Sequence, residues 1–396
     1  MIWKKIKLKK LLTKPVQNGY SPICPATSSG QWILGLGALN GSGLDITQIK
    51  PAPVDDHRVE KFLLFSGDFL ISRSNTLDKV GRTALFKGQI EHCAYPDLMM
   101  RFRADDPRIH LAFLEYYLRS SEAVRHFRRA ASGTSGSMMK ISKIVVENLQ
   151  VPLPPLGEQN AIASILSTWD VAIEKIEQLI AAKEQKNTRL INNLFSTDKH
   201  PRVHIRDFTT EVSKRNNGTA INRVLSVTNN KGFVLPEDRF ERRVASSDLS
   251  NYKVVTSGQY AYNPSRINVG SIARLDGWDA GVLSPMYVVF KIDEKKVDSD
   301  FFLHWLSSHD AKAHIRRSAQ GSVRETVSFK DLGAISFPMP LLDKQIEVTS
   351  ILNIARKEID LLRKQLEAHR KQKRGLMQKL LTGTWQMKST KGCGNG

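Results

Sequence analysis

The sequence predicts an α+β protein of two homologous mixed domains, each followed by a long helix, with the two helices packed as an antiparallel coiled coil. Three observations predict this fold. A proline-rich motif occurs twice, as VPLPPLGEQ at 151–159 and as FPMPLLDKQ at 337–345. An apolar pattern with helical spacing follows each copy for about 40 residues. The segments that precede the two copies also resemble each other, which indicates an internal duplication with a pseudo-twofold relation.

Composition limits the partners that this protein can have. The chain has 396 residues, enough for two or three domains, with 59 Lys and Arg against 39 Asp and Glu and a formal net charge of +20. This excess favours a polyanionic partner, because Lys and Arg displace the counterions condensed on phosphates. The three cysteines form no CxxC pair, which argues against a cysteine zinc site and fits a reducing cytoplasm. No apolar run approaches the roughly 18 residues of a membrane span, so we expect a cytoplasmic protein without membrane contact.

The first domain is predicted to occupy residues 1–155. Short alternating runs such as FLLFSGDFLIS are typical of strands separated by Gly, Asn and Asp turns. The run LAFLEYYLRSSEAVRHF predicts one amphipathic helix. It leads through the loop GTSGSMMKIS into a β-like run, KIVVENLQV, which reaches the first proline motif.

The second domain is predicted at residues 198–341 and repeats this order. GQYAYNPSR corresponds to GDFLISRS, and NVGSIARL corresponds to KVGRTALF. The helix DFFLHWLSSHDAKAHI, the loop GSVRETVS and the β-like run FKDLGAISF then follow in the same succession. The loop after GDFLIS is about four residues longer than its counterpart, as loops that differ in function often are. We therefore expect the two domains to recognise different nucleic-acid sequences, which would make the target asymmetric.

Residues 156–197 and 342–385 predict the two long helices, and residues 386–396 are expected to form a disordered tail. The prolines of each motif end a strand, and helical backbone angles can begin directly after them. Apolar residues at spacings of three and four predict a coiled-coil seam. The seam residues are predicted to be Ile165, Trp169, Ile176, Ile180 and Leu190 in the first helix and Ile351, Leu362, Leu366 and Leu376 in the second. Lys183 and Asn187 interrupt the first seam where His369 and Lys373 interrupt the second, which indicates that the helices pack on each other.

Cationic and polar residues at corresponding places in the two domains are candidates for DNA contacts. Arg and Asn read guanine and adenine edges with paired hydrogen bonds, and Gly/Ser loops allow a close approach to phosphates. The candidates after the GDFLIS and GQYAYN runs are Arg73, Asn75, Lys79 and Arg82, and Arg266, Asn268 and Arg274. The candidates at the helix ends and in the Gly/Ser loops are Arg128, Arg129, Ser137 and Lys140, and Arg316, Arg317, Ser322 and Arg324.

Motifs that could carry catalysis are incomplete, so we expect no catalytic and no metal-binding residues. YNPSR at 262–266 lacks the second proline and the final aromatic residue of the adenine methyltransferase motif that it faintly resembles. YPDLMM at 95–100 has the Pro-Asp pair of metal-dependent nucleases but no acidic-x-Lys partner after it. His304, His309 and His314 are spaced by five residues, which distributes them around a helix instead of clustering them for zinc.

The duplicated motif with a long helix behind each copy, together with GDFLISRS and QKLLTGTW, resembles the specificity subunits of type I restriction–modification systems. The resemblance covers residues 3–385, although the second motif has Leu341 for the second Pro and Lys344 for Glu. It implies two target recognition domains on double-stranded DNA, each binding half of a split target, and a helix pair that fixes the spacer. It further implies docking of two methyltransferase subunits and of restriction subunits that translocate DNA. This chain would bind no cofactor; S-adenosylmethionine, ATP and Mg²⁺ would belong to those partners.

Two other functions stay open from the sequence. The chain could be a DNA methyltransferase or nuclease whose motifs are not recognisable, and binding of S-adenosylmethionine by the isolated chain would favour this class. It could also be a coiled-coil DNA-binding regulator without a catalytic partner. Sequence-specific binding without association with a methyltransferase would favour the regulator.

Overall fold

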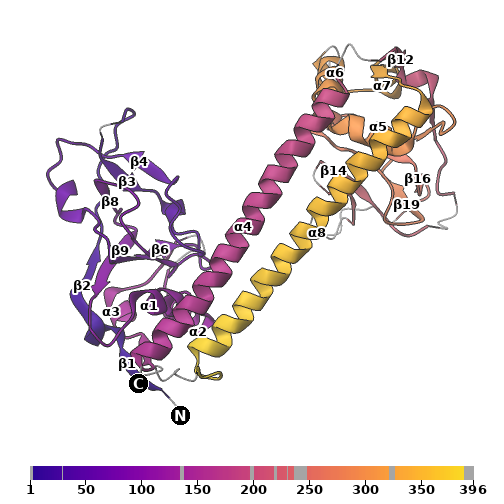
Figure 1. Cartoon of the computed structure of the whole chain (residues 1–396). Helices are drawn as coiled ribbons and strands as arrows, with labels where there is room; N and C mark the ends of the chain where they lie inside the picture. Colours follow the sequence, from indigo (N-terminus) through magenta and orange to yellow (C-terminus); the bar gives the residue numbers. More distant parts are fainter. Residues whose placement is uncertain are drawn as a thin grey trace. The chain divides into compact units, whose positions relative to one another are not determined.

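The computed structural model describes residues 3–28, 30–133, 138–196, 200–217, 221–229, 231–235, 248–320 and 326–387. Two compact units emerge: Met1–Ile176 with Gln365–Gly396, and Glu177–Lys364. Each unit therefore combines one globular domain with part of helix α4 (Leu156–Leu194) and part of helix α8 (Leu342–Leu381) (Figure 1). Among the described residues, no helix is both long and apolar enough to cross a membrane.

The first unit is built on an antiparallel sheet with the strand order β2-β9-β5-β7. These strands are β2 (Leu12–Asn18), β9 (Met99–Ala104), β5 (Asp68–Ser72) and β7 (Thr83–Leu85). Every residue of β5 is buried, because both faces of the sheet are covered. Phe69 and Ile71 pack in the core that contains helix α1 (Leu111–Leu118), whereas Leu70 points to a second core on the other face.

Three smaller sheets complete the first unit. One has the order β4-β3-β8, one joins β6 to β10, and one joins β1 to β11. Their strands are β1 (Lys4–Lys7), β3 (Trp32–Leu34), β4 (Ile49–Pro51), β6 (Ser74–Asn75), β8 (Cys93–Ala94), β10 (Met139–Lys140) and β11 (Gln150–Leu153). Short 3-10 helices lie at η1 (Leu8–Leu11), η2 (Leu36–Ala38) and η3 (Val59–Phe62).

The second unit repeats the central sheet, with the strand order β13-β20-β17-β18. Its strands are β13 (Thr209–Glu211), β20 (Val288–Ile292), β17 (Tyr260–Tyr262) and β18 (Ile272–Arg274). The pairs β12 (Arg202–His204) with β21 (Ser336–Pro338), β14 (Ser226–Thr228) with β15 (Gly232–Val234), and β16 (Lys253–Thr256) with β19 (Ala280–Leu283) surround it, with η4 (Ile205–Asp207) and η6 (Ile267–Val269). Corresponding glycines before the third strand of each sheet, Gly67 and Gly258, both have positive φ, 93° and 81°. The shared order of strands confirms the predicted α+β duplication.

The single amphipathic helix that was predicted before each Gly/Ser loop is in fact two shorter helices. The first is divided into α1 and α2 (Ser121–Ala130), and the second into α5 (Ser299–Ser307) and α6 (His309–Gln320). At both breaks a serine caps the new helix: Ser120 Oγ accepts from the backbone N–H of Ala123 at 3.3 Å, and Ser308 Oγ from that of Ala311 at 3.1 Å. An N-cap hydroxyl satisfies a free amide and starts a new helical direction, which outweighed the continuous apolar spacing.

The predicted β-like runs before the proline motifs also begin as helices. Helix α3 (Lys143–Glu147) starts at the cap Ser142, and helix α7 (Phe329–Gly333) starts at a capping box of Ser328 and Asp331. Only the last few residues of each run form a strand, because these pair with β1 and β12. In α3 the β-branched residues of KIVVE favoured the prediction of a strand, whereas FKDLG in α7 has none.

Matching glutamines fix the start of each long helix to its domain. Gln159 Oε1 accepts from the backbone N–H of His110 at 2.8 Å, and its Nε2 donates to the carbonyls of Arg108 and Pro154. Gln345 makes the same set of bonds to Asp298, Lys296 and Pro340. Both glutamines are completely buried. The last residue of each proline motif is therefore a buried glutamine that joins the long helix to its domain by hydrogen bonds.

The residues predicted for the seam of α4 and α8 differ in how far they are buried. Ile180 and Leu366 are buried, and Ile165, Trp169, Ile176, Leu190, Leu362 and Leu376 are half-buried. Ile351 is 52% exposed, so the prediction is wrong there, and the adjacent Leu352 is fully buried instead. The hydrogen bonds of Gln345 fix the rotation of α8 about its own axis relative to the second domain. Positions that follow at spacings of three and four from Gln345 include Leu352, and Ile351 lies about 100° around the helix.

The polar interruptions of the two seams find different partners, because the helices run antiparallel within each unit (Figure 1). In the second unit Lys183 forms an ion pair with Glu358 at 2.7 Å. In the first unit Lys373 forms an ion pair with Asp170, and His369 lies against Trp169 with ring centroids 5.4 Å apart. The two predicted polar layers therefore do not face each other.

The predicted tail, 386–396, lies largely outside the described residues, which end at Met387. The backbone N–H of Met387 donates to Glu158 Oε1 at 2.9 Å, and Lys379 Nζ lies 4.1 Å from the ring centroid of Trp385. The segment after α8 thus packs on the start of α4 inside the first unit.

Candidate nucleic-acid interface

Two features that the sequence identified separately are neighbours in both units. One is the loop after the third strand of the sheet order, β5 or β17, and the other is the segment that follows the Gly/Ser loop. In the first unit the N–H of Ile141 donates to the carbonyl of Arg73 at 3.0 Å. In the second unit the N–H of Val327 donates to the carbonyl of Pro264 at 3.1 Å. The loops span residues 73–82 and 263–271 between their strands, so they differ by one residue and not by the predicted four.

In the first unit the predicted residues divide into tethered and exposed side chains. Arg73 Nη1 donates to the carbonyl of Asp97 at 3.2 Å, and Asn75 Oδ1 accepts from the N–H of Thr76. Arg82 lies 3.7 Å from the Asp78 carboxylate, and Arg128 Nη2 donates to the carbonyl of the same residue at 2.7 Å. The remaining described candidates, all exposed, are Lys79, Arg129 and Lys140.

These contacts order the first interface. Ser74 and Asn75 pair with Lys140 and Met139 in the small β6–β10 sheet, so the Lys140 segment lies directly beside the loop at 73–82. Arg128 on α2 is joined to the same loop through Asp78. The structure therefore brings loop, helix end and returning segment to one surface of the unit.

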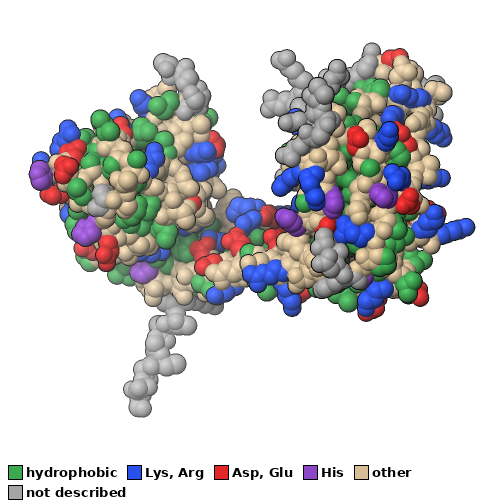
Figure 2. Space-filling view, turned by 90° about the horizontal axis from the view of Figure 1, so that it is seen from above, with side chains coloured by type: hydrophobic (Ala, Val, Ile, Leu, Met, Phe, Trp, Pro, Cys, Tyr) green, Lys and Arg blue, Asp and Glu red, His purple; other side chains and the backbone are tan. Residues whose placement is uncertain are grey.

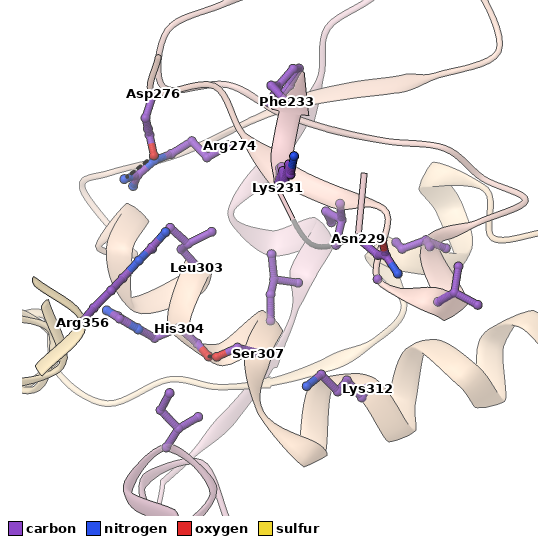
Figure 3. A pocket seen from close by; sticks show the side chains of 18 of the residues that line it. Asn229, Lys231, Phe233, Arg274, Asp276, Leu303, His304, Ser307, Lys312 and Arg356 are labelled. Carbon is purple, nitrogen blue, oxygen red and sulfur yellow. Dashed lines mark hydrogen bonds and ion pairs between the residues drawn. The ribbon is translucent and has the colours of Figure 1, made fainter. Parts of the chain in front are cut away.

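In the second unit a groove of about 1040 Å³ gathers three predicted residues: Asn268, Arg274 and Arg316. Figure 3 shows the groove with residues from β14–β15, α5, α6 and α8 around it. Arg266 and Arg317 are exposed; Arg317 Nε donates to the carbonyl of Ala313. Ser137, Ser322 and Arg324, which were also predicted, lie outside the described residues.

Arg274 is bound to the protein itself. Its guanidinium lies 2.6 Å from Asp276 Oδ1, 2.5 Å from Asp300 Oδ1 and 3.0 Å from Ser299 Oγ. Only 16% of the side chain is exposed. Bonds to two carboxylates satisfy most of its donors, so Arg274 holds the interface together more readily than it reads a base.

Besides Arg363, three cations of the groove were not found from the sequence: Lys231 on the β14–β15 turn, Lys312 on α6 and Arg356 on α8 (Figure 3). All three are exposed. Lys312 precedes Arg316 by one helical turn, a spacing that could have identified it. Lys231 and Arg356 are distant in the sequence, and only the fold brings them to the groove.

The groove has an acidic side as well. Glu184 and Asp360 line it, and Arg363 forms ion pairs with both, 2.7 Å from Glu184 Oε1 and 3.3 Å from Asp360 Oδ1. Within the described part of the chain, no carboxylate forms an ion pair with the other exposed cations of the groove, which are Lys231, Lys312, Arg316 and Arg356. Cations without a carboxylate partner are the side chains that can bind phosphates and release counterions. Figure 2 shows that Lys and Arg side chains are exposed at many points on the visible face of this unit.

A chain of polar side chains, half-buried at Asp300 and Asn353 and buried at His304, connects the groove to α8. Asp300, which holds Arg274, accepts from Asn353 Nδ2 at 2.7 Å, and Asn353 Oδ1 lies 2.8 Å from His304 Nε2. Burial lowers the pKa of His304 below its usual value, so the neutral ring is favoured. The chain of bonds ties the loop strand β18 to the long helix through α5.

His304 lies on α5, whereas His309 and His314 lie on α6, so the histidines do not form a cluster. Within the described part of the chain, no group of three or more His, Cys, Asp or Glu residues is arranged to hold a metal ion.

Comparisons with known proteins agree on one family. Residues 37–184 match the family described as type I restriction modification DNA specificity domain. The chain is 25% identical to the putative type I restriction enzyme MjaX specificity subunit of Methanocaldococcus jannaschii, over 98% of this chain and 94% of that protein. It is 23% identical to the MjaVIII specificity subunit of the same organism, over 70% and 71% of the two chains.

Solved structures show the same fold. The S subunit of a type I restriction–modification system from M. genitalium is similar with a TM-score of 0.58 and 15% identity, over 96% of both chains. A chain solved in work on complex assembly and conformational transition of the type I system has a TM-score of 0.58 and 14% identity, over 97% and 98% of the two chains. The likeness extends over both domains and both long helices.

Proposed function

Because residues 37–184 match the type I restriction modification DNA specificity domain, and the chain is similar to a specificity subunit over 98% of its length, we propose that it is a specificity subunit whose two units each recognise one half of a split DNA target. The observation that carries the proposal is the repeated interface. In each unit a loop after the third sheet strand is hydrogen-bonded to the segment that returns from the Gly/Ser loop. One interface built twice in one chain is suited to a target of two parts.

The contacts of each side chain favour a division of roles at this interface. Lys231, Lys312, Arg316 and Arg356 bind phosphates, since they are exposed and lie on several elements around one groove. Arg266 and Asn268 in the second loop read bases in this proposal, and Arg73 and Asn75 do so in the first after giving up their contacts to Asp97 and Thr76. Arg274 keeps its loop in position through Asp276 and Asp300.

The long helices are proposed to dock two methyltransferase subunits. In the second unit α8 exposes a row of apolar side chains away from the seam: Ile351 at 52%, Ile354 at 70% and Leu361 at 56%. Residues three and seven positions apart lie on one face of a helix, so these three form an apolar strip suited to a protein partner. Restriction subunits would join this assembly, and S-adenosylmethionine, ATP and Mg²⁺ would be bound by the partners, leaving recognition to this chain.

The test is to co-express the chain with the methyltransferase encoded beside it and to map N6-methyladenine across the host genome by single-molecule sequencing. We expect a split motif with a fixed spacer that is absent when either protein is omitted. No new methylation, with both proteins soluble and associated, would contradict the proposal and favour a regulator. Methylation by this chain without the partner would instead identify it as an enzyme.

A further inference from the structure

The globular part of the second unit carries two large hydrophobic side chains that are far more exposed than the others described between residues 200 and 340. Val269 is 60% exposed and Met286 is 61% exposed. Isolated exposed apolar residues are ordinary on protein surfaces. Here, however, both lie at the candidate DNA interface, where an apolar side chain has a specific possible partner.

Val269 belongs to the loop at 263–271, which we call the recognition loop of the second unit; the loop at 73–82 is the recognition loop of the first. Val269 lies in η6, next to Asn268 and three residues after Arg266. Met286 lies on the turn between β19 and β20, and Asn263 Nδ2 donates to its Sδ at 3.8 Å. Tyr262, the last residue of β17, pairs with Val288, the first residue of β20. The turn with Met286 and the recognition loop therefore lie at the same end of these two neighbouring strands.

The first unit has an equivalent arrangement. Leu77, within the recognition loop, is 47% exposed, and Met138 is 49% exposed. Ser74 Oγ donates to Met138 Sδ at 3.6 Å, which holds this thioether beside the loop. Each unit therefore presents an aliphatic residue in the loop and a methionine bound to the loop by a polar side chain.

The two methionines come from different elements. Met138 directly precedes β10, after the Gly/Ser loop, whereas Met286 lies in a turn of the sheet. The duplication alone therefore does not explain why both loops have a thioether beside them.

We propose that Leu77 and Met138 in the first unit, and Val269 and Met286 in the second, contact thymine 5-methyl groups in the major groove. The inference rests on the proposed function. Thymine is distinguished in the major groove by this methyl group, and apolar side chains are its usual partners. Methionine fits such a contact well because its thioether is flexible and polarisable. The surrounding Arg, Lys and Asn side chains favour a nucleic acid over a protein partner, which would bury a larger continuous apolar patch.

The test uses the chain with its methyltransferase and an unmethylated duplex of the mapped target. Each thymine is replaced in turn by deoxyuridine, which lacks the methyl group, and the dissociation constant is measured by fluorescence anisotropy. Every half-site with a methylatable adenine also has a thymine opposite it, so each half-site can be tested. Loss of one buried methyl contact is expected to weaken binding roughly three- to fivefold.

The variants assign each methyl group to a side chain. M286A should bind the thymine and deoxyuridine duplexes equally at one position, while M286L should keep the difference because it keeps an apolar contact. L77A, M138A and V269A should each remove a different sensitivity. V54A, at a residue that is 50% exposed outside both loops, is the matched control and should change none.

Two results would overturn the inference alone: binding that tolerates deoxyuridine at every position, or sensitivities that persist in all four alanine variants. Failure to bind the unmodified target over unrelated DNA would instead remove the proposed function, and this inference with it.

Discussion

Arg316 and Arg274 show that two predicted arginines in one groove can have opposite roles. Arg316 is exposed on α6 and lies in the groove with Lys312 one turn before it. Arg274 is mostly buried and bound to Asp276 and Asp300. Arg316 is free to pair with a DNA phosphate, whereas Arg274 is already paired with carboxylates of the protein.

We therefore expect R316A and R274A to fail in different ways. R316A should weaken binding to all DNA sequences alike and reduce the slope of log K against log salt by about one, because one phosphate contact is lost. Folding should be unchanged. R274A should reduce the free energy of unfolding by roughly 1–2 kcal/mol, since the half-buried Asp300 and the exposed Asp276 both lose their partner. Binding at several salt concentrations and urea unfolding measure the two effects.

R206A is the matched control for R316A, because Arg206 is an exposed arginine on η4 and does not line the groove. A salt slope that R206A changes as much as R316A would show that only net charge matters. An unchanged slope in R316A would exclude this side chain from the phosphate contacts.

Residue-level prediction of the site from sequence was partial for a physical reason. Duplication identified both recognition loops, and the structure places Asn268, Arg274 and Arg316 around one groove. The sequence could not show that Asp300 binds Arg274, because this ion pair joins separate elements. For the same reason it could not place Arg356 there.

At the scale of elements, the glutamine that ends each proline motif decides how a long helix meets its domain. Gln159 and Gln345 are buried, and each accepts one backbone N–H and donates to backbone carbonyls. A buried amide with its bonds satisfied contributes to stability, but a replacement that leaves these backbone groups unpaired costs their full desolvation. The repeated contact explains why a glutamine ends both copies of the motif although other positions differ.

We predict that Q345E destabilises the second unit more than Q345A. The carboxylate would place a second acceptor against the carbonyls of Lys296 and Pro340, where the amide now donates. The expected loss is roughly 2–4 kcal/mol of unfolding free energy, against roughly 1–3 kcal/mol for the alanine variant. Urea unfolding followed by circular dichroism measures both. The pair Q159E and Q159A repeats the comparison in the first unit, and equal stability of the Glu and Ala variants would show that donation by the glutamine amide is unimportant.

Element boundaries were predictable where one strong signal acted alone. Proline followed by long apolar spacing gave both long helices, whose observed ranges are Leu156–Leu194 and Leu342–Leu381. Prediction failed where a local cap competed with that spacing, as at Ser120 and Ser308. It also failed at Ile351, since the rotation of a helix depends on contacts such as the hydrogen bond from Asp298 to Gln345 and not on spacing alone.

At the scale of the whole molecule, the two helices each pass without interruption from one unit into the other. α4 has 39 residues, which corresponds to a length of about 60 Å at 1.5 Å per residue. A helix has a fixed length, so the pair is suited to set the spacing of the two half-sites that we propose. Ion pairs keep the pair in register, with Lys183 on Glu358 and Asp170 on Lys373.

The last prediction concerns this length. Four residues inserted after Lys183 in α4 alone should alter or abolish recognition, because the seam downstream turns by about 40° relative to α8. Seven residues inserted after Ile176 and seven after Lys364, at opposing places on the antiparallel pair, should preserve the seam, since a heptad restores its phase. The added length of about 10 Å corresponds to roughly three base pairs. We expect the matched variant to methylate the same two half-sites with a longer spacer, as mapped by single-molecule sequencing. An unchanged spacer in that variant would mean that the domains, and not the helices, measure the distance.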